Sequence, residues 1–191
     1  MGPKTLVTET SPEARFRELY ASTYADVLRF VLRRAHTSHA EDVTAEVFTV
    51  AWRRLAQVPA SPGDAKAWLL GVARHTLHNS HRSRQRYEAL AVRIAQELPR
   101  HVDGDTEVLT RRLDLAAAWP RLSPADQEAI ALIAWEGLTT AQAAAVIGTS
   151  AVAFRLRLSR ARRTLRRHLG EPTEGASRQT FLQQQTDRRS R

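Results

Sequence analysis

The clearest chemical signal in the sequence is a run of arginines near its C-terminal end. Seven Arg and no Asp or Glu lie between Leu138 and Gly170. The seven are Arg155, Arg157, Arg160, Arg162, Arg163, Arg166 and Arg167. A guanidinium group forms paired hydrogen bonds with phosphate and with guanine, so a block of one sign predicts a polyanionic partner. From charge alone, a solvated basic helix that closes a helical bundle is the alternative.

The residues ahead of the arginines indicate how they are positioned. Thr139 or Thr140 can cap a short helix, and Gly148 can end it with a positive φ. Ser150 can cap the next helix. The apolar residues of that helix recur at helical spacing, and they are Phe154, Leu158, Ala161 and Leu165. The pattern predicts a helix-turn-helix whose second helix lies in a DNA major groove.

A second basic surface is predicted far from the first in the sequence. A loop rich in Pro, Ser and Gly spans Gln57–Asp64, and Asp64 can cap the helix that follows. One side of that helix carries basic and polar residues at helical spacing: Arg74, His78, His81, Arg82 and Gln85. The only acid from Arg74 to Ile94 is Glu88. Two basic surfaces joined by an acidic connector suggest two contacts with one long polyanion.

The helix expected to begin at Thr37 or Ser38 suggests a different chemistry. Its inner stripe is predicted to be Val43, Val47, Val50, Ala51 and Leu55. Its other residues include acids and large aromatics: Asp42, Glu46, Phe48 and Trp52. The charges can simply solvate the helix, or the acidic and aromatic edge can bind a protein. The residues themselves leave both interpretations open.

Composition limits the class of protein. The chain has 191 residues, 42% of them hydrophobic, and a net charge of +9. Only two basic residues are lysines, Lys4 and Lys66, which suits nucleic acid but also follows from a GC-rich genome. There is no cysteine, which excludes disulfides and thiolate metal sites. No apolar run reaches the roughly 18 residues of a membrane span. With no signal-peptide core either, a cytoplasmic protein without membrane insertion is predicted.

The element pattern predicts an all-α protein of two small helical domains. The first is expected over residues 12–95, beginning with the capped helix at Ser11-Pro12. A flexible acidic linker is expected over 96–112, and the second domain over 113–170. In that domain the core face is expected to include Ile130, Ile133, Ala134 and Trp135. The polar tail 171–191 is predicted to be disordered.

Three histidines on the third helix raise the question of a metal site. They are His75, His78 and His81. Three ligands on one surface helix close no cavity, and no carboxylate is expected to converge on them. No Ser-His-Asp set, glycine-rich phosphate loop or paired carboxylate motif stands out either. The sequence therefore predicts no metal, no cofactor and no enzymatic activity.

Three motifs in order resemble those of bacterial sigma-70 factors. The first comprises Ala40-Glu41-Asp42-Val43, Glu46-Val47-Phe48 and Ala51-Trp52. The second is Ala67-Trp68-Leu69 followed by Val72-Ala73-Arg74, and the third is Arg157-Leu158-Ser159-Arg160-Ala161-Arg162. The spacing leaves no room for a further domain between them. The chain resembles the minimal two-domain group, the extracytoplasmic-function (ECF) sigma factors, over about Phe16–Leu169.

The resemblance implies a set of partners and site residues. Such proteins bind core RNA polymerase and promoter DNA, help to open the duplex, and are often held by an anti-sigma factor. The polymerase contact is expected at Asp42, Glu46, Phe48 and Trp52. The –10 element is expected to meet Ser61, Lys66, Trp68, Arg74, His75, His78, Asn79 and Arg82. The –35 element is expected to meet Thr149, Ser150, Arg155, Arg157, Arg160 and Arg163.

Departures from the family pattern affect the promoter sequence more than the fold. His75 and Asn79 stand where the family often has Asn and Asp, and Ala153 and Leu156 replace a Thr and a Ser. Two other classes compete with the sigma factor. A helix-turn-helix regulator that acts without core polymerase would need a dimerisation or sensing domain. An adaptor that binds only protein is disfavoured by the arginine block.

Overall fold

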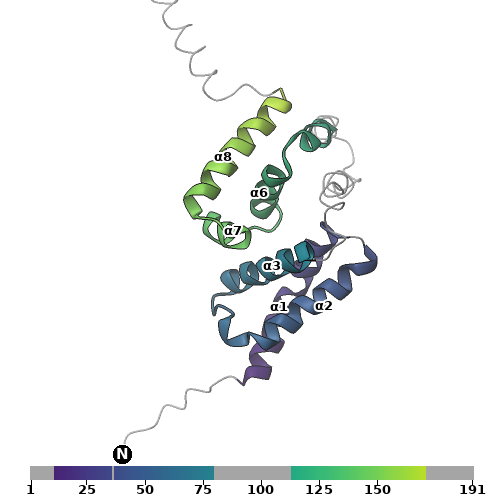
Figure 1. Ribbon diagram of the computed structural model, residues 1–191, viewed down its shortest axis with the longest axis vertical. Helices are drawn as coiled ribbons and strands as arrows, with labels where there is room; N and C mark the ends of the chain where they lie inside the picture. The colour runs from purple at the N-terminus through teal and green to yellow at the C-terminus, as the bar shows by residue number, and fades with distance from the viewer. Residues whose placement is uncertain (1–10, 36, 80–112, 171–191) are drawn as a thin grey trace, which may run out of the picture. The chain divides into compact units, whose positions relative to one another are not determined.

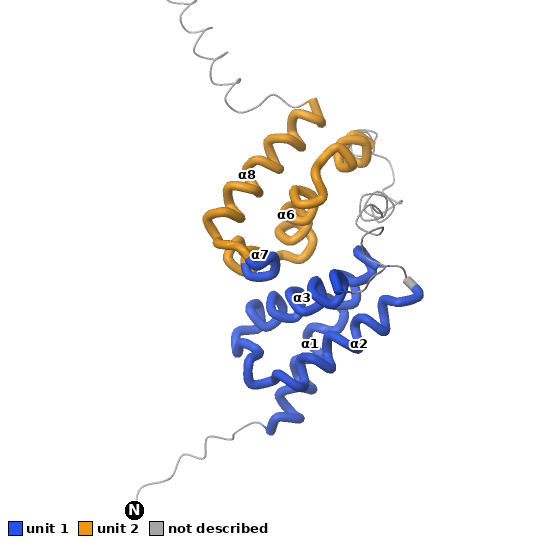
Figure 2. The backbone as a smooth tube through the Cα atoms, in the orientation of Figure 1, with its two compact units in different colours: residues 1–84, 145–148 blue, residues 85–144, 149–191 orange. Residues whose placement is uncertain are grey.

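The computed structural model describes residues 11–35, 37–79 and 113–170 (Figure 1). Within these ranges every element is a helix and none of the residues forms a strand, which confirms the predicted all-α class. The chain divides into two compact units, residues 1–84 with 145–148 and residues 85–144 with 149–191 (Figure 2). The predicted linker over 96–112 and the predicted tail over 171–191 lie outside the described residues.

Helix α1 (Pro12–Leu32) begins as predicted. The hydroxyl of Ser11 accepts a hydrogen bond from the backbone N–H of Ala14 at 3.2 Å, and a proline occupies the first turn, where its missing N–H costs nothing. Its buried residues are Thr23, Val27, Phe30 and Val31. They form the face that packs on α2 (Thr37–Arg53) and α3 (Pro62–Asn79).

Helices α2 and α3 both begin earlier than the sequence predicts. Thr37 is already helical, so neither it nor Ser38 is the residue that precedes α2. Ser61 precedes α3, and its carbonyl accepts from the N–H of Ala65 at 2.8 Å. Asp64 therefore lies in the first turn rather than at the cap, because Pro62 takes the first helical position. A short 3₁₀ helix, η1 (Leu55–Gln57), connects the two helices.

The second unit is built from a helical stretch over 113–118, η2 (Trp119–Arg121), α6 (Pro124–Ala134), the first half of α7 (Thr140–Ile147) and α8 (Ala151–His168). Trp119 and Leu122 are buried together, and α8 joins this cluster through Leu165. The side chain of Gln127 donates to the carbonyls of Trp119 and Leu122 at 2.9 and 3.3 Å. A buried amide thus satisfies the backbone where η2 leads into α6.

The core face of α6 differs from the prediction at Ala134 and Trp135. Ala134 is exposed and Trp135 is 37% exposed, whereas Gln127, Ala129, Ala131 and Leu132 are buried. Ile130 packs against the buried Trp119 and Leu122 as expected, and the hydrogen-bonded Gln127 also faces inward. A polar residue with satisfied hydrogen bonds can occupy a core position that apolar periodicity alone does not assign to it.

The turn between α7 and α8 matches the prediction closely. The hydroxyl of Thr139 accepts from the N–H of Gln142 at 3.3 Å, and the Gln142 side chain accepts from the N–H of Thr139 at 3.0 Å. This reciprocal pair is a capping box. Gly148 has a φ of 77°, and the Ser150 hydroxyl accepts from the N–H of Ala153 at 3.1 Å. The helix-turn-helix is therefore present, with a cap at the start of each of its helices.

Gly148 offers a direct test of the turn. Nothing lies within 4 Å of where a Cβ would be, so Gly148→Ala introduces only the cost of a left-handed backbone. We expect a loss of about 1–2 kcal/mol in the free energy of unfolding, measured by urea denaturation. Gly148→Asn should lose less, because Asn tolerates this region better. An alanine variant as stable as the parent would contradict the turn geometry.

Candidate nucleic-acid interface

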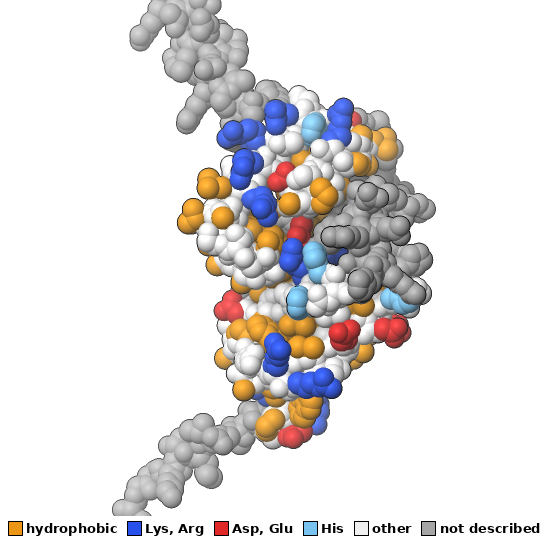
Figure 3. All heavy atoms as spheres, in the orientation of Figure 1, with side chains coloured by type: hydrophobic (Ala, Val, Ile, Leu, Met, Phe, Trp, Pro, Cys, Tyr) orange, Lys and Arg blue, Asp and Glu red, His pale blue; other side chains and the backbone are white. Residues whose placement is uncertain are grey.

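Helix α8 divides into a buried stripe and a basic surface. Phe154, Leu158 and Ala161 are 1%, 6% and 0% exposed, and Leu165 is half-buried against Trp119 and Leu122. This confirms the stripe predicted from the sequence. Figure 3 shows Lys and Arg side chains along α8 and hydrophobic side chains gathered at its N-terminal end. The helix is held by its apolar side while its arginines remain available to a partner.

The residues predicted to meet the –35 element lie at the start of α8 and along its outer side. Ser150 caps the helix, and Arg155, Arg160 and Arg163 are exposed. Thr149 and Arg157 are half-buried. The guanidinium of Arg160 donates from Nε to the carbonyl of Leu156 at 3.4 Å, so this hydrogen bond does not use its two terminal nitrogens. The arrangement can present several cationic forks to one groove.

In the first unit, a cleft of about 390 Å³ lies between α1, the loop after η1 and the start of α3. Its lining includes Arg15, Ser22, Asp26, Val58, Pro59 and Lys66. Arg15 donates from a terminal nitrogen to the carbonyl of Val58 at 2.6 Å, which ties the loop to α1. The cleft combines charged groups with an apolar wall, a combination that suits a planar polar ligand such as a base.

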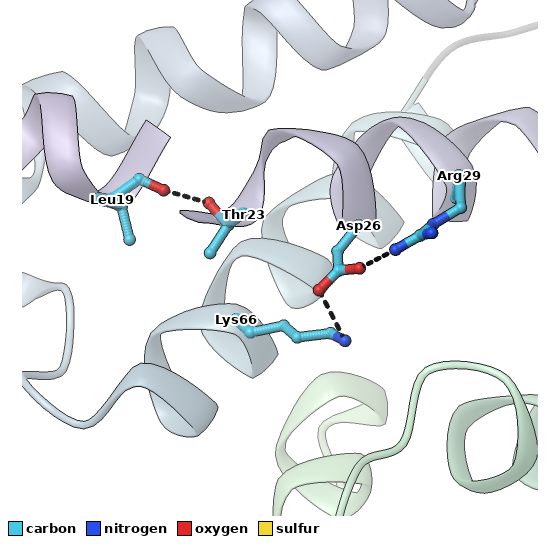
Figure 4. Close-up of polar contacts among 5 residues, drawn as sticks. All are labelled: Leu19, Thr23, Asp26, Arg29 and Lys66. Atoms are coloured by element: carbon cyan, nitrogen blue, oxygen red, sulfur yellow. Dashed lines mark hydrogen bonds and ion pairs between the residues drawn. The ribbon is translucent and has the colours of Figure 1, made fainter. Parts of the chain in front are cut away.

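Asp26 links α1 to α3 at the side of this cleft (Figure 4). Its carboxylate is 2.8 Å from Nζ of Lys66 and also pairs with Arg29 one turn along α1. Burial raises the pKa of Asp26, but hydrogen bonds from Lys66 and Arg29 outweigh it and hold the pKa below its ordinary value. The carboxylate is therefore charged at neutral pH. It holds the ammonium group of Lys66 beside α1, near the N-terminal end of α3.

The residues predicted to meet the –10 element have unequal access to solvent. Ser61, His75, His78 and Asn79 are exposed, and Trp68 and Arg74 are half-buried. The side-chain amide nitrogen of Asn79 is 3.3 Å from Nε2 of His75. Lys66, also predicted to meet the –10 element, has its ammonium group paired with Asp26. Arg82 lies outside the described residues.

The same helix carries the histidines considered as metal ligands. His75 and His78 are exposed on α3, and His81 lies outside the described residues. Across 11–35, 37–79 and 113–170, no three His, Cys, Asp or Glu side chains gather closely enough to hold a metal ion. The histidines of α3 are instead part of the same polar surface as Asn79.

Three of the four residues predicted for the polymerase contact are accessible on α2. Asp42 and Glu46 are exposed and Trp52 is 45% exposed. Phe48 is only 3% exposed, so it does not present its ring to a partner. Its ring centroid lies 4.7 Å from that of Tyr20 on α1. The expectation that Phe48 contacts the polymerase directly is wrong in this structure, because tertiary packing buries it.

Sequence reasoning missed the aromatic residues of α1 that surround Phe48 and Trp52. Phe16, Tyr20 and Tyr24 recur every fourth residue, so their spacing places them on one face of α1 but does not show which helix that face packs against. The ring of Phe16 lies 5.1 Å from that of Trp52, nearly edge to face. Phe16, Tyr20 and Trp52, together with the stems of Glu13 and Arg17, line an open and largely apolar hollow. The exposed ring of Trp52 is thus held in place by its contact with Phe16 on α1.

Two segments of the chain match known protein families. Residues 19–87 match the family described as sigma-70 region 2, and residues 112–165 match sigma-70, region 4. The chain is 34% identical over 152 residues to the ECF RNA polymerase sigma factor SigC of Mycobacterium tuberculosis, covering 75% of this chain and 77% of that one. It is 29% identical over 172 residues to the ECF sigma factor SigK of Mycolicibacterium vanbaalenii, covering 86% of each.

Two solved structures share the fold. The sigma factor RpoE of Bartonella quintana, in complex with the anti-sigma factor NepR, has a TM-score of 0.55 at 22% identity and covers 81% of this chain and 96% of that one. CnrH in complex with the cytosolic domain of CnrY has a TM-score of 0.54 at 23% identity, covering 84% and 90%. None of the helices in the described part of the chain is long and apolar enough to span a membrane.

The pairing at Asp26 makes a prediction for titration. Lys66→Met removes the stronger hydrogen bond while burial remains, so the pKa of Asp26 should rise. Arg29→Gln serves as the matched comparison and should raise it less. The measurement is carboxyl-detected NMR titration of the full chain. Equal shifts in the two variants, or no shift with Lys66→Met, would contradict the geometry.

The same pairing predicts how stability depends on pH. The folded pKa of Asp26 lies below the unfolded value, so its contribution is fully present above about pH 4 and is lost as the pH falls through the folded pKa. In Lys66→Met, the free energy of unfolding should therefore fall less steeply as the pH is lowered below about 4. Urea denaturation at a series of pH values, compared with Arg53→Gln at an exposed site, provides the check.

Proposed function

Because the chain belongs to the extracytoplasmic-function (ECF) sigma factors of the sigma-70 family, we propose that it binds core RNA polymerase and directs it to promoters. In this proposal residues 12–95 form region 2, residues 96–112 the linker and residues 113–170 region 4. The matched segments 19–87 and 112–165 support these bounds. The chain acts by binding, without enzymatic activity or a cofactor, and works in the cytoplasm.

The observation that carries the proposal is the exposed basic side of α8. Five of its seven arginines are exposed, on a helix that follows a capped turn, the arrangement in which a second helix enters a major groove. A core that hid these arginines would have removed the basis for DNA binding. In region 4, the contacts with the –35 element then fall on Ser150, Arg155, Arg160 and Arg163, with Arg157 and Thr149 at the edge of the surface.

Region 2 is proposed to hold the opened –10 element. The cleft beside the loop 57–64 has room for an unstacked base, and His75, His78 and Asn79 lie exposed on α3 for the strand that follows. Binding a flipped base offsets the few kcal/mol that unstacking costs. Lys66 can reach a phosphate only by sharing or leaving Asp26, so we assign it a role in fixing α3 as well.

The proposed polymerase contact is the outer edge of α2 at Asp42, Glu46 and Trp52. Their exposure supports this role, and Phe48 supports Trp52 indirectly through the aromatic residues of α1. An anti-sigma factor is a further proposed partner, because RpoE, which shares the fold, is in complex with the anti-sigma factor NepR in its solved structure.

The experiment that tests the proposal is reconstituted transcription. Purified protein is added to core RNA polymerase from a related bacterium, and genomic fragments are transcribed and sequenced. We expect initiation at a defined set of promoters that share two upstream elements. If the protein binds specific DNA but core-dependent initiation is absent across the genome, the chain acts as a regulator without polymerase, and the proposal is wrong.

The polymerase contact has its own test. Trp52→Ala combined with Glu46→Lys removes an exposed ring and reverses a charge, so affinity for core polymerase should fall about tenfold or more. Binding of the full-length variant to DNA without polymerase should be unchanged. Asp114→Lys, an equal charge change at an exposed site in the second unit, is the matched control and should bind core polymerase normally. Equal losses in both proteins would contradict the assignment.

A further inference from the structure

Two large apolar side chains are exposed on the DNA-facing side of α8. Val152 is 58% exposed and Leu156 is 60% exposed, and they lie one turn apart in the first half of the helix. Both lie on the opposite side of α8 from the buried stripe that contains Phe154 and Leu158. Their exposure is therefore a property of the outer face and not of a frayed end. Neither residue contributes to the core that holds the helix in place.

The surroundings of this pair are cationic. Arg155, Arg160 and Arg163 are exposed on the same helix, and no acid occurs between Leu138 and Gly170. A second copy of this surface, or another basic protein, would be repelled by the arginines. A polyanion satisfies the arginines and brings its own surface against Val152 and Leu156. Charge complementarity thus selects nucleic acid as the occupant.

The major groove offers one kind of apolar group. Each base pair presents hydrogen-bond donors and acceptors there, and only thymine adds a 5-methyl group. An aliphatic side chain placed against guanine or cytosine removes water from polar edges and returns no hydrogen bond. Against a thymine methyl it buries apolar surface on both partners. A helix with aliphatic residues at the centre of its reading surface therefore distinguishes thymine by contact.

We propose that Val152 and Leu156 are specificity-determining residues that read thymine 5-methyl groups in the –35 element. The arginines around them supply phosphate and guanine contacts, and the aliphatic pair fixes where thymine must lie. This inference rests on the proposed function, because it assumes that α8 enters promoter DNA. It goes further in assigning a base identity to two residues that cannot form hydrogen bonds with bases.

Replacing thymine by deoxyuridine tests the idea, because it removes the methyl and keeps every hydrogen-bonding group. Holoenzyme formed from the full chain and core polymerase first selects binders from duplexes with a randomised upstream element. Each thymine of the selected element is then replaced by deoxyuridine, one at a time. We expect one or two positions at which affinity falls about fourfold, the effect of about 0.8 kcal/mol for one buried methyl-sized group.

The variants Val152→Ala and Leu156→Ala connect the effect to the side chains. At the position read by each residue, the alanine variant should bind thymine and deoxyuridine about equally. Leu113→Ala, which truncates another exposed leucine of the second unit at 64% exposure, should keep the full discrimination. Because both positions are largely exposed, the alanine variants should fold, and circular dichroism confirms this before binding is measured.

Each outcome decides a separate question. A selected element that shows no deoxyuridine effect, or an effect that persists in both alanine variants, overturns the thymine assignment while the proposed function stands. Alanine variants that fail to join core polymerase also overturn it, since the pair would then contact protein. If the holoenzyme selects no upstream element at all, the proposed function fails, and this inference fails with it.

Discussion

Burial of one apolar stripe keeps the arginine-rich helix folded and exposed at the same time. Seven like charges on a short segment repel one another, and no acid between Leu138 and Gly170 relieves this. Phe154, Leu158 and Ala161 anchor α8 in the core, and Ser150 caps its start. Arg166, Arg167 and His168 lie in the last turn, where the helix dipole favours positive charge. The cationic surface depends on these attachments.

In the first unit, a hydrogen bond and an ion pair hold the proposed DNA-binding surface in place. Arg15 bonds to the carbonyl of Val58, and Asp26 pairs with Lys66 on α3. Both contacts border the cleft beside the loop, so they fix its walls before any ligand arrives. A preformed site loses less conformational entropy on binding than one that must order itself. The two units thus present their proposed DNA contacts on surfaces that packing and hydrogen bonds hold in place.

Local signals in the sequence predicted the parts of the structure that local forces determine. The stripe of α8, the positive φ of Gly148 and the cap at Ser150 all follow from spacing and residue type. Side chains fixed by partners distant in the sequence were not predictable in this way. Phe48 is buried by aromatic residues of α1, and Lys66 is held by Asp26. Periodicity within one helix contains no information about such partners.

The absence of cysteine from the sequence permits a direct measurement of the central claim. Ser61→Cys and Ser159→Cys, at exposed sites in the first and second units, each give one attachment point for an iron chelate that cleaves nearby DNA. In promoter-bound holoenzyme, we expect cleavage near the –10 element from position 61 and near the –35 element from position 159. Cleavage of the same stretch from both positions, or none from position 159, would contradict it.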